Sequence, residues 1–357
     1  NLGSQQRSAG VIEGNGQMKD GALNMTLKTD ALDLQRLDGR LRATKLRGEL
    51  LIRHASGRQE FTLSMAEPLK RNPLTLQAHA LIADDAIVID KAELRAGNSA
   101  ADLTARIGLA ETQAFDATAK IRNFDPRHFG DFADAPKLTL NADLAAKGKR
   151  HPALEADATF RISDSQLEGN ALTGNGQLAL RAETLSIPGL TVVAGNNRLS
   201  AQGKLAEQNA SITFSIDAPN LAQLGKSFGG VLKLDGDVRG SVQQPKLAAN
   251  WTAKSLRLPG QLQVDGTQGK LDLALDRRAN AFLLASLGLD ADAQGLRTTT
   301  QQLRQLTASA RFGGQANAPL MLRVRGDGIS GQQLDAEHFD INGDGTTAQH
   351  VLRATLV

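Results

Sequence analysis

A loose repeat of about 94 residues runs through the chain and consists almost entirely of alternating strand patterns. Three related segments mark it, with first residues 93 and 94 positions apart: 30–34 (DALDL), 123–127 (NFDPR) and 217–221 (DAPNL). A repeat that cannot bury its own apolar face stacks on its neighbours, which gives an elongated body. We therefore expect one continuous segment over 1–357, with approximate repeats 1–95, 96–190, 191–290 and a partial repeat 291–357.

Period-two alternation is the dominant local pattern, as in 153–162, 211–216 and 270–275. Successive side chains of a strand point to opposite faces, so this pattern places apolar residues on one face and polar residues on the other. The segments 220–228 and 126–130 follow or contain a proline and predict short helices at the repeat boundaries. Turn signals between the runs predict an antiparallel meander. They are Gly14-Asn15, Gly97-Asn98, the segment 195–197, Pro259-Gly260, Asp265-Gly266 and the segment 342–345.

The fold class that these patterns predict is all-β, an elongated and curved antiparallel sheet with few short helices. Too many strands follow one another for a small closed barrel, so we expect an open sheet (a β-taco or open groove) whose apolar face lines a trough. Glycines or bulges within strands are needed to bend such a sheet. The glycines that fit this role are Gly48, Gly203, Gly236, Gly240 and Gly269.

Composition excludes several classes of function. The chain has no cysteine, which removes disulfides, thiolate metal sites and cysteine nucleophiles. Its 41 basic and 38 acidic residues are interspersed, and aromatics make up only 3%, which argues against nucleic-acid binding. No stretch reaches the ~18 apolar residues that span a bilayer. Because the chain begins at Asn1 rather than Met, we expect a segment of a longer protein, with any membrane anchor outside it.

No catalytic, cofactor or metal motif stands out. Residues 326–331 (GDGISG) match the spacing of a dinucleotide fingerprint, but the alternating pattern that follows predicts a hairpin turn rather than a helix. Residues 340–345 resemble half of a calcium loop, yet Val351 stands where a bidentate Glu is needed, so a tight turn is expected there too. The six histidines are scattered without metal-site spacing. We expect no cofactor, no metal and no enzymatic activity.

The apolar stripe of the strands is the pattern with functional content. Such alternation is also typical of the inside of a sandwich or barrel. The repeat, the scarcity of aromatics and the small or unbranched side chains favour instead an open lining for acyl chains. Each CH₂ removed from water contributes about 0.8 kcal/mol, so a ~16-carbon chain gains roughly 10 kcal/mol there. The candidate lining residues are Leu138, Leu140, Leu144, Phe160, Ile162, Leu178, Leu180, Ile212, Phe214, Ile216, Leu232, Leu234, Val238, Leu271, Leu273 and Leu275.

The segment 215–225, with its Ala-Pro-Asn-Leu core, leads into the glycine-punctuated segment 230–247, and 344–352 lies near the end. These segments resemble the TamB family, the translocation and assembly module subunits, within the AsmA-like bridge-shaped lipid-transfer proteins. The resemblance implies a periplasmic β-taco with a hydrophobic groove, anchored in the inner membrane of Gram-negative bacteria and meeting the outer-membrane barrel TamA. It also implies passage of phospholipid to the outer membrane and assembly of autotransporter-type proteins.

Three functions remain in view. The first is a non-enzymatic periplasmic conduit that shields phospholipid acyl chains between the two membranes. The second is a scaffold or chaperone that pairs with nascent outer-membrane strands by β-augmentation and carries no lipid. The third, an enzyme or carbohydrate-binding solenoid, is disfavoured because stacked aromatics and carboxylate clusters are lacking.

Overall fold

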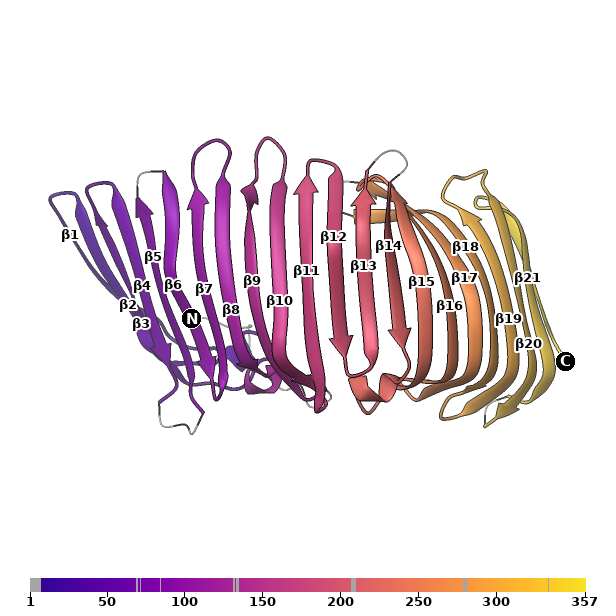
Figure 1. Ribbon diagram of the computed structural model, residues 1–357. Coiled ribbons are helices and arrows are strands. Elements are labelled where there is room, and N and C mark those ends of the chain that lie inside the picture. Colours follow the sequence, from indigo (N-terminus) through magenta and orange to yellow (C-terminus); the bar gives the residue numbers. More distant parts are fainter. Residues whose placement is uncertain are drawn as a thin grey trace. The chain divides into compact units, whose positions relative to one another are not determined.

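The computed structural model describes residues 8–68, 70, 72–83, 85–130, 132, 135–206, 210–278, 281–332 and 334–357. The chain divides into two compact units, Asn1–Asn175 and Gly176–Val357, which we describe separately as unit 1 and unit 2. Both units are built from β-strands with short connections (Figure 1).

Unit 1 contains ten complete strands in chain order. They are β1 (Glu13–Lys19), β2 (Ala22–Leu32), β3 (Leu46–Ala55), β4 (Arg58–Ala66), β5 (Leu74–Ala83), β6 (Ala86–Ala96), β7 (Ser99–Gly108), β8 (Ala114–Phe124), β9 (Leu138–Lys149) and β10 (Glu155–Leu167). Strand β11 (Asn170–Arg181) crosses the boundary between the units.

Unit 2 contains the remaining strands, which are longer toward its middle. They are β12 (Thr184–Ala194), β13 (Asn197–Leu205), β14 (Ser211–Ala218), β15 (Gly229–Gly240), β16 (Pro245–Leu258), β17 (Leu262–Arg278), β18 (Ala281–Arg297), β19 (Gln301–Gly313), β20 (Pro319–Gly331), β21 (Ala336–Thr346) and β22 (His350–Leu356).

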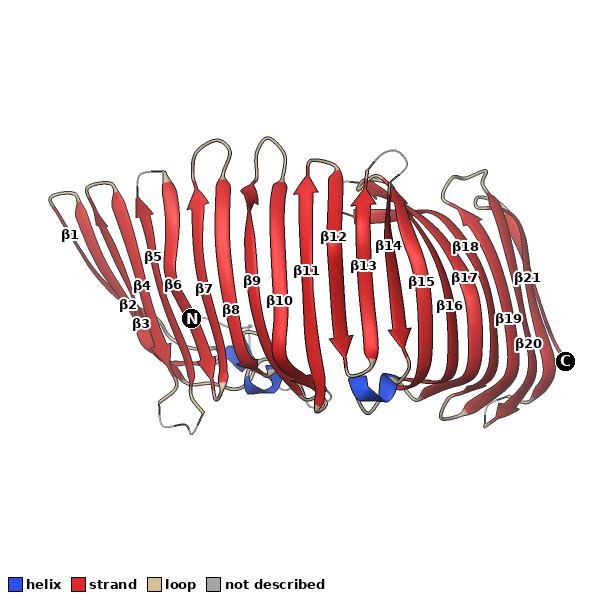
Figure 2. Ribbon diagram, in the orientation of Figure 1, coloured by secondary structure: helices blue, strands red, loops and turns tan. Residues whose placement is uncertain are grey.

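Each unit is an antiparallel meander. From β1 to β10, and again from β12 to β22, every strand pairs with the next strand in the sequence. Figure 2 shows strands nearly throughout, with a few short helices at strand ends. The all-β antiparallel class predicted from the sequence is therefore confirmed. Among the described residues, the recorded partner of β1 is β2 and that of β22 is β21, so each meander is open at that end.

The two short helices predicted at 126–130 and 220–228 are confirmed as 3₁₀ turns, η2 (Pro126–His128) and η3 (Leu221–Leu224). A third, η1 (Leu34–Arg36), occupies the corresponding place after β2. In η1 and η2 the N-cap carboxylates, Asp33 and Asp125, accept a hydrogen bond from the backbone N–H two residues later. Each of the three helices begins within, or at the last residue of, one of the segments that mark the sequence repeat. The repeat boundaries themselves stay a prediction.

Several predicted turns are wrong. Gly14-Asn15 lies inside β1, Asp265-Gly266 inside β17 and residues 342–345 inside β21. Residues 326–331 form the end of β20 instead of a hairpin turn, and within them Gly328 has a left-handed φ of 67°. At Gly14, Gly326 and Gly343 a Cβ would overlap a side chain of the neighbouring strand, so these glycines allow close packing on a sheet face rather than chain reversal. The turns at Gly97-Asn98, Gly195-Asn196 and Pro259-Gly260 are confirmed.

The glycines predicted to bend the sheet act in two ways. Gly203 and Gly240 have positive φ values of 128° and 89°, which a residue with a Cβ adopts poorly. Gly48, Gly236 and Gly269 have no positive φ, but a Cβ on any of them would overlap the neighbouring strand or its side chains. Register shifts add further bends in both units, for instance between Ile89 and Ala92 and between Ala274 and Leu275.

The connections that carry η1 and η2 meet in unit 1. Leu41 forms an isolated antiparallel bridge with Gly130, and Arg42 donates its backbone N–H to the Phe129 carbonyl at 3.0 Å. Beneath them lies the apolar cluster of Leu46, Leu74 and Ala96, which are 2%, 4% and 0% exposed and contact Leu34 and Phe129. These connections cover one end of the apolar face of unit 1.

A buried ion pair fastens the same connections. The Glu67 side chain is only 1% exposed and pairs with the guanidinium of Arg42 and, at 2.6 Å, with the ammonium of Lys70. Its carboxylate also accepts the backbone N–H of Leu74 at 2.9 Å. A buried carboxylate needs such partners to offset its lost hydration.

Candidate functional site: the apolar faces of the sheets

One face of unit 2 is apolar across nine consecutive strands. Residues directly opposite each other in an antiparallel pair present their side chains on the same face, so the printed register traces rows across the sheet. One such row contains only apolar residues or glycine from β14 to β22: Ile216, Leu234, Trp251, Gly269, Ala291, Ala308, Val324, Ile341 and Ala354.

The next row, one residue along each strand, faces the other way and is polar throughout. It contains Asp217, Lys233, Thr252, Gln268, Asp292, Thr307, Arg325, Asp340 and Thr355. The alternation seen in single strands is therefore kept in register across unit 2, and it separates an apolar face from a polar face.

Unit 1 has the same organisation. A row across its strands β1 to β10 contains Gly16, Met25, Ile52, Phe61, Ala80, Ile89, Ala105, Ala117, Ala146 and Ala158. Small side chains dominate its second half, which keeps this part of the face shallow and smooth.

The residues predicted to line a groove form one group in unit 1, a second group in unit 2 and a pair on β11. In unit 1, Leu144 pairs with Phe160, Ile162 pairs with Ala142, and Leu138 and Leu140 continue the same parity of β9. In unit 2, register joins the predicted residues of β14, β15 and β17 on one face: Ile212, Phe214, Ile216, Leu232, Leu234, Val238, Leu271, Leu273 and Leu275. Leu178 and Leu180 share one face of β11.

Most of these side chains are neither buried nor free. Ile212 is buried at 6% exposure and Leu144 is exposed at 38%, while the other predicted residues are half-buried. The interior of a sandwich would bury such leucines almost completely. The apolar faces thus retain accessible hydrocarbon surface that an apolar ligand could cover.

Aromatic rings lie over glycines on the apolar face of unit 2. Phe214 stands directly opposite Gly236, and a Cβ on that glycine would lie 2.5 Å from Cζ of the ring. Trp251 over Gly269 and Phe339 over Gly326 repeat the arrangement. A ring that lies flat on the neighbouring backbone adds apolar area without projecting into the space above the sheet.

The polar faces carry arginine–aspartate ion pairs with a recurring geometry. Nη2 of Arg311 lies 2.6 Å from Oδ2 of Asp290, and its Nη1 donates to the carbonyls of Leu289 and Ala310, each at 2.9 Å. The guanidinium, with the Ser309 hydroxyl second, lowers the pKa of Asp290. The same three contacts recur at Arg95, Arg122 and Arg323 with Asp102, Asp143 and Asp344.

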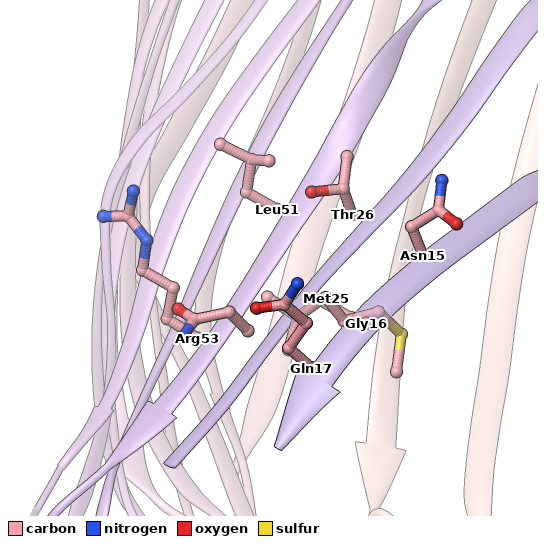
Figure 3. Close-up of a pocket in the computed structure, with 9 residues that line it drawn as sticks. Asn15, Gly16, Gln17, Met25, Thr26, Leu51 and Arg53 are labelled. Carbon is pink, nitrogen blue, oxygen red and sulfur yellow. The ribbon is translucent and has the colours of Figure 1, made fainter. Parts of the chain in front are cut away.

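A hollow on β1, β2 and β3 offers no chemistry of its own (Figure 3). Register places Asn15, Thr26 and Leu51 in one row, on the polar face and not with the apolar row of Gly16 and Met25. Its lining combines amides, apolar groups, the Thr26 hydroxyl and the Arg53 guanidinium, with no carboxylate or histidine among them to act as a general base.

Sequence reasoning missed much of the apolar face. It selected no residue of β2 to β8 or of β18 to β22, and it passed over Trp251. The same parity rule finds Leu287 and Leu289 in β18, and Leu320, Leu322 and Val324 in β20. In β16 the signal is weak, because alanines occupy both parities at Ala248 and Ala249.

Within the residues that the structure describes, the helices span three or four residues each, and none has the length or apolar character to cross a bilayer. The strand register gives the described part of the chain two surfaces that can bind a partner. One is the extended apolar face, and the other is the polar face with its arginine–aspartate pairs.

Comparison with known proteins shows which family the chain resembles. The chain is similar to the translocation and assembly module subunit TamB of Haemophilus influenzae, with 23% identity over 352 residues, which cover 88% of this chain and 26% of that protein. The chain thus spans about a quarter of the length of this curated relative. No solved structure matches the chain. The family described as the N-terminal domain of TamB matches residues 59–283, more than half of the 357 residues. The chain belongs to the TamB family.

Proposed function

We propose that this chain is a periplasmic segment of a bridge that shields and conducts phospholipid acyl chains between the inner and outer membranes, without enzymatic activity. The observation that carries this proposal is the apolar row kept in register across β14 to β22, with side chains left half-buried. A uniform apolar face gains free energy from every methylene it covers, at about 0.8 kcal/mol each, and no site along it is much deeper than the next.

The single tryptophan provides a direct test. Trp251 lies in the apolar row beside Leu234 and Gly269, and the chain has no tyrosine. We expect phospholipids with brominated acyl chains to quench its fluorescence, because bromine quenches on contact. The matched control is the double variant Trp251→Phe with Thr252→Trp, which moves the tryptophan to the polar face. In this variant quenching is expected to be lost. Equal quenching of both reporters would contradict the proposal.

A role in outer-membrane protein assembly is the second candidate. The relative from Haemophilus influenzae is named a translocation and assembly module subunit, which favours participation in an assembly process. The outer-membrane barrel TamA is the partner that the family resemblance suggests. On this view the chain is a scaffold that pairs with nascent outer-membrane strands by β-augmentation. Phospholipid co-purifying with the chain favours the conduit, while a lipid-free chain that binds unfolded outer-membrane β-strand peptides favours the scaffold.

A further inference from the structure

Several arginines on the polar faces pair with an aspartate, and others, such as Arg106 and Arg161, have no such pair in the described part of the chain. Two unpaired arginines differ from all of these in lying toward an apolar face. Arg150 and Arg277 are exposed, and within the described ranges neither guanidinium has a hydrogen-bond or ion-pair partner. Both lie where an apolar face reaches the strand ends that point away from the 3₁₀ helices.

Arg277 lies on the apolar side of β17. It is two residues beyond Leu275 and four beyond Leu273, so strand periodicity places it on their face. It stands directly opposite Phe282, and Leu275 stands opposite Leu284. Phe282 and Leu284 are 50% and 39% exposed, so the cation borders open apolar surface.

Arg150 occupies the corresponding position in unit 1. It directly follows β9, which ends at Lys149, and its backbone N–H and that of His151 both donate to the Thr112 carbonyl at 3.0 Å. Periodicity places it on the side of Ala146 and Leu144. Nearby strand ends carry Ile107, Leu109 and Leu154, which are 38%, 49% and 49% exposed.

The two sites share one chemistry. Each combines an unpaired guanidinium with accessible hydrocarbon at the edge of a long apolar face. A guanidinium matches the oxygens of a phosphate group bidentately, whereas a neutral ligand would leave the charge without a partner. The matching ligand has an anionic phosphate on apolar chains, with the chains directed onto the face and the phosphate at its rim.

We propose that Arg150 and Arg277 bind the phosphate of a phospholipid whose acyl chains lie on the adjacent apolar face. This inference rests on the proposed function and adds two headgroup positions to it. Both arginines act through charge and hydrogen bonding in partly hydrated sites, so each contributes modestly and its contribution weakens as salt screens it.

The test compares lipids that differ in the phosphate alone. Equilibrium binding of dioleoylphosphatidylglycerol and of dioleoylglycerol from mixed micelles is measured for the chain, for the variant Arg150→Glu with Arg277→Glu, and for a control. The control is Lys147→Glu with Lys246→Glu, which reverses exposed charges of the polar parity on β9 and β16. We expect the arginine variant to lose phosphatidylglycerol binding about 5-fold per site, with dioleoylglycerol unchanged, and the control to match the unmodified chain.

Three results would overturn the inference. One is equal phosphatidylglycerol binding by the arginine variant and the unmodified chain. Another is an equal loss of both lipids, which assigns the arginines a structural role. The third is inorganic phosphate binding to the unmodified chain without displacing lipid, which marks an anion site unrelated to headgroups. If the unmodified chain binds neither lipid, it is the proposed function that fails.

Discussion

The indole of Trp251 lies over Gly269 of the neighbouring strand, and a Cβ on that glycine would overlap the ring. The indole N–H points to the Thr267 hydroxyl at 3.4 Å, at the outer limit of a hydrogen bond. The lack of a side chain at Gly269 allows the Trp251 ring to lie against the neighbouring strand. The packing of this pair therefore affects the shape of the apolar surface that a ligand would contact.

Gly269→Val is expected to displace the indole and to lower the free energy of unfolding by about 1–3 kcal/mol, because the new side chain overpacks the site. The fluorescence maximum of Trp251 should shift to the red as the ring becomes more hydrated. Gly266→Ala is the matched control on the same strand, since no atom lies within 4 Å of a Cβ built there. Denaturant unfolding measures the change in the free energy of unfolding. An unchanged emission maximum in Gly269→Val would contradict the displacement of the indole.

Glu67→Gln is expected to destabilise unit 1 by about 2–3 kcal/mol, because hydrogen bonds to a charged, buried carboxylate are lost while Arg42 stays partly buried. Hydrogen exchange should speed up at the Arg42 N–H, which bonds to Phe129, and at Leu74. The control is Glu111→Gln, an exposed carboxylate in the loop after β7. Equal exchange rates in both variants would show that the connections are held by other contacts.

The stability of unit 1 is expected to depend on the charge of His79. Its Nδ1 lies 2.7 Å from Asp90 and its Nε2 3.0 Å from Glu60, and these carboxylates raise its pKa above the ordinary 6.5. Lys91 stands opposite His79 on the adjacent strand β6, and Arg53 on β3 stands opposite Glu60. A raised pKa means that the folded state favours the charged imidazole, so this stabilisation is complete below pH 6.5 and is lost as pH rises through the folded pKa.

The difference in melting temperature between the unmodified chain and His79→Asn should therefore be largest in mildly acidic buffer and shrink in alkaline buffer. The effect is expected to be small, because the imidazole is 30% exposed and screened by solvent. His350→Asn serves as control, as His350 is an exposed histidine of β22. A difference that grows with pH would reverse the assigned sign.

Charges on the apolar face of unit 2 are expected to block lipid binding with little loss of fold. Phe214→Asp or Leu234→Arg should lower phospholipid binding at least about tenfold, because acyl chains would have to desolvate a charge. Thr213→Asp and Lys233→Glu place comparable charges on the polar face and should leave binding unchanged. Circular dichroism checks that each variant retains its strands. Normal phospholipid binding by Leu234→Arg would show that the apolar face of unit 2 is not the binding surface.

Strand parity was readable from the sequence because one face is apolar in each strand, as in Ile212, Phe214 and Ile216. The short helices were readable as well, since Pro126 and Pro219 fix the chain at their starts. Cross-strand register was not readable, because bulges such as the one between Ile162 and Gln166 change parity without a distinct sequence pattern. The turn errors at Gly266 and Gly343 arose because a glycine inside a strand and a glycine in a turn look alike in a sequence. At Gly343 the strand requires the glycine, since a Cβ there would lie 2.7 Å from the Leu352 side chain, whereas at Gly266 the space is open.

The most direct test of the account is site-specific photocrosslinking to phospholipid at neighbouring positions of opposite parity. A crosslinking residue is placed singly at Phe214, Thr213, Leu234 or Lys233, and lipid attached to the chain is quantified after illumination. The account predicts strong crosslinking at Phe214 and Leu234, whose side chains share the apolar face, and background levels at Thr213 and Lys233. Equal yields at all four positions would contradict it.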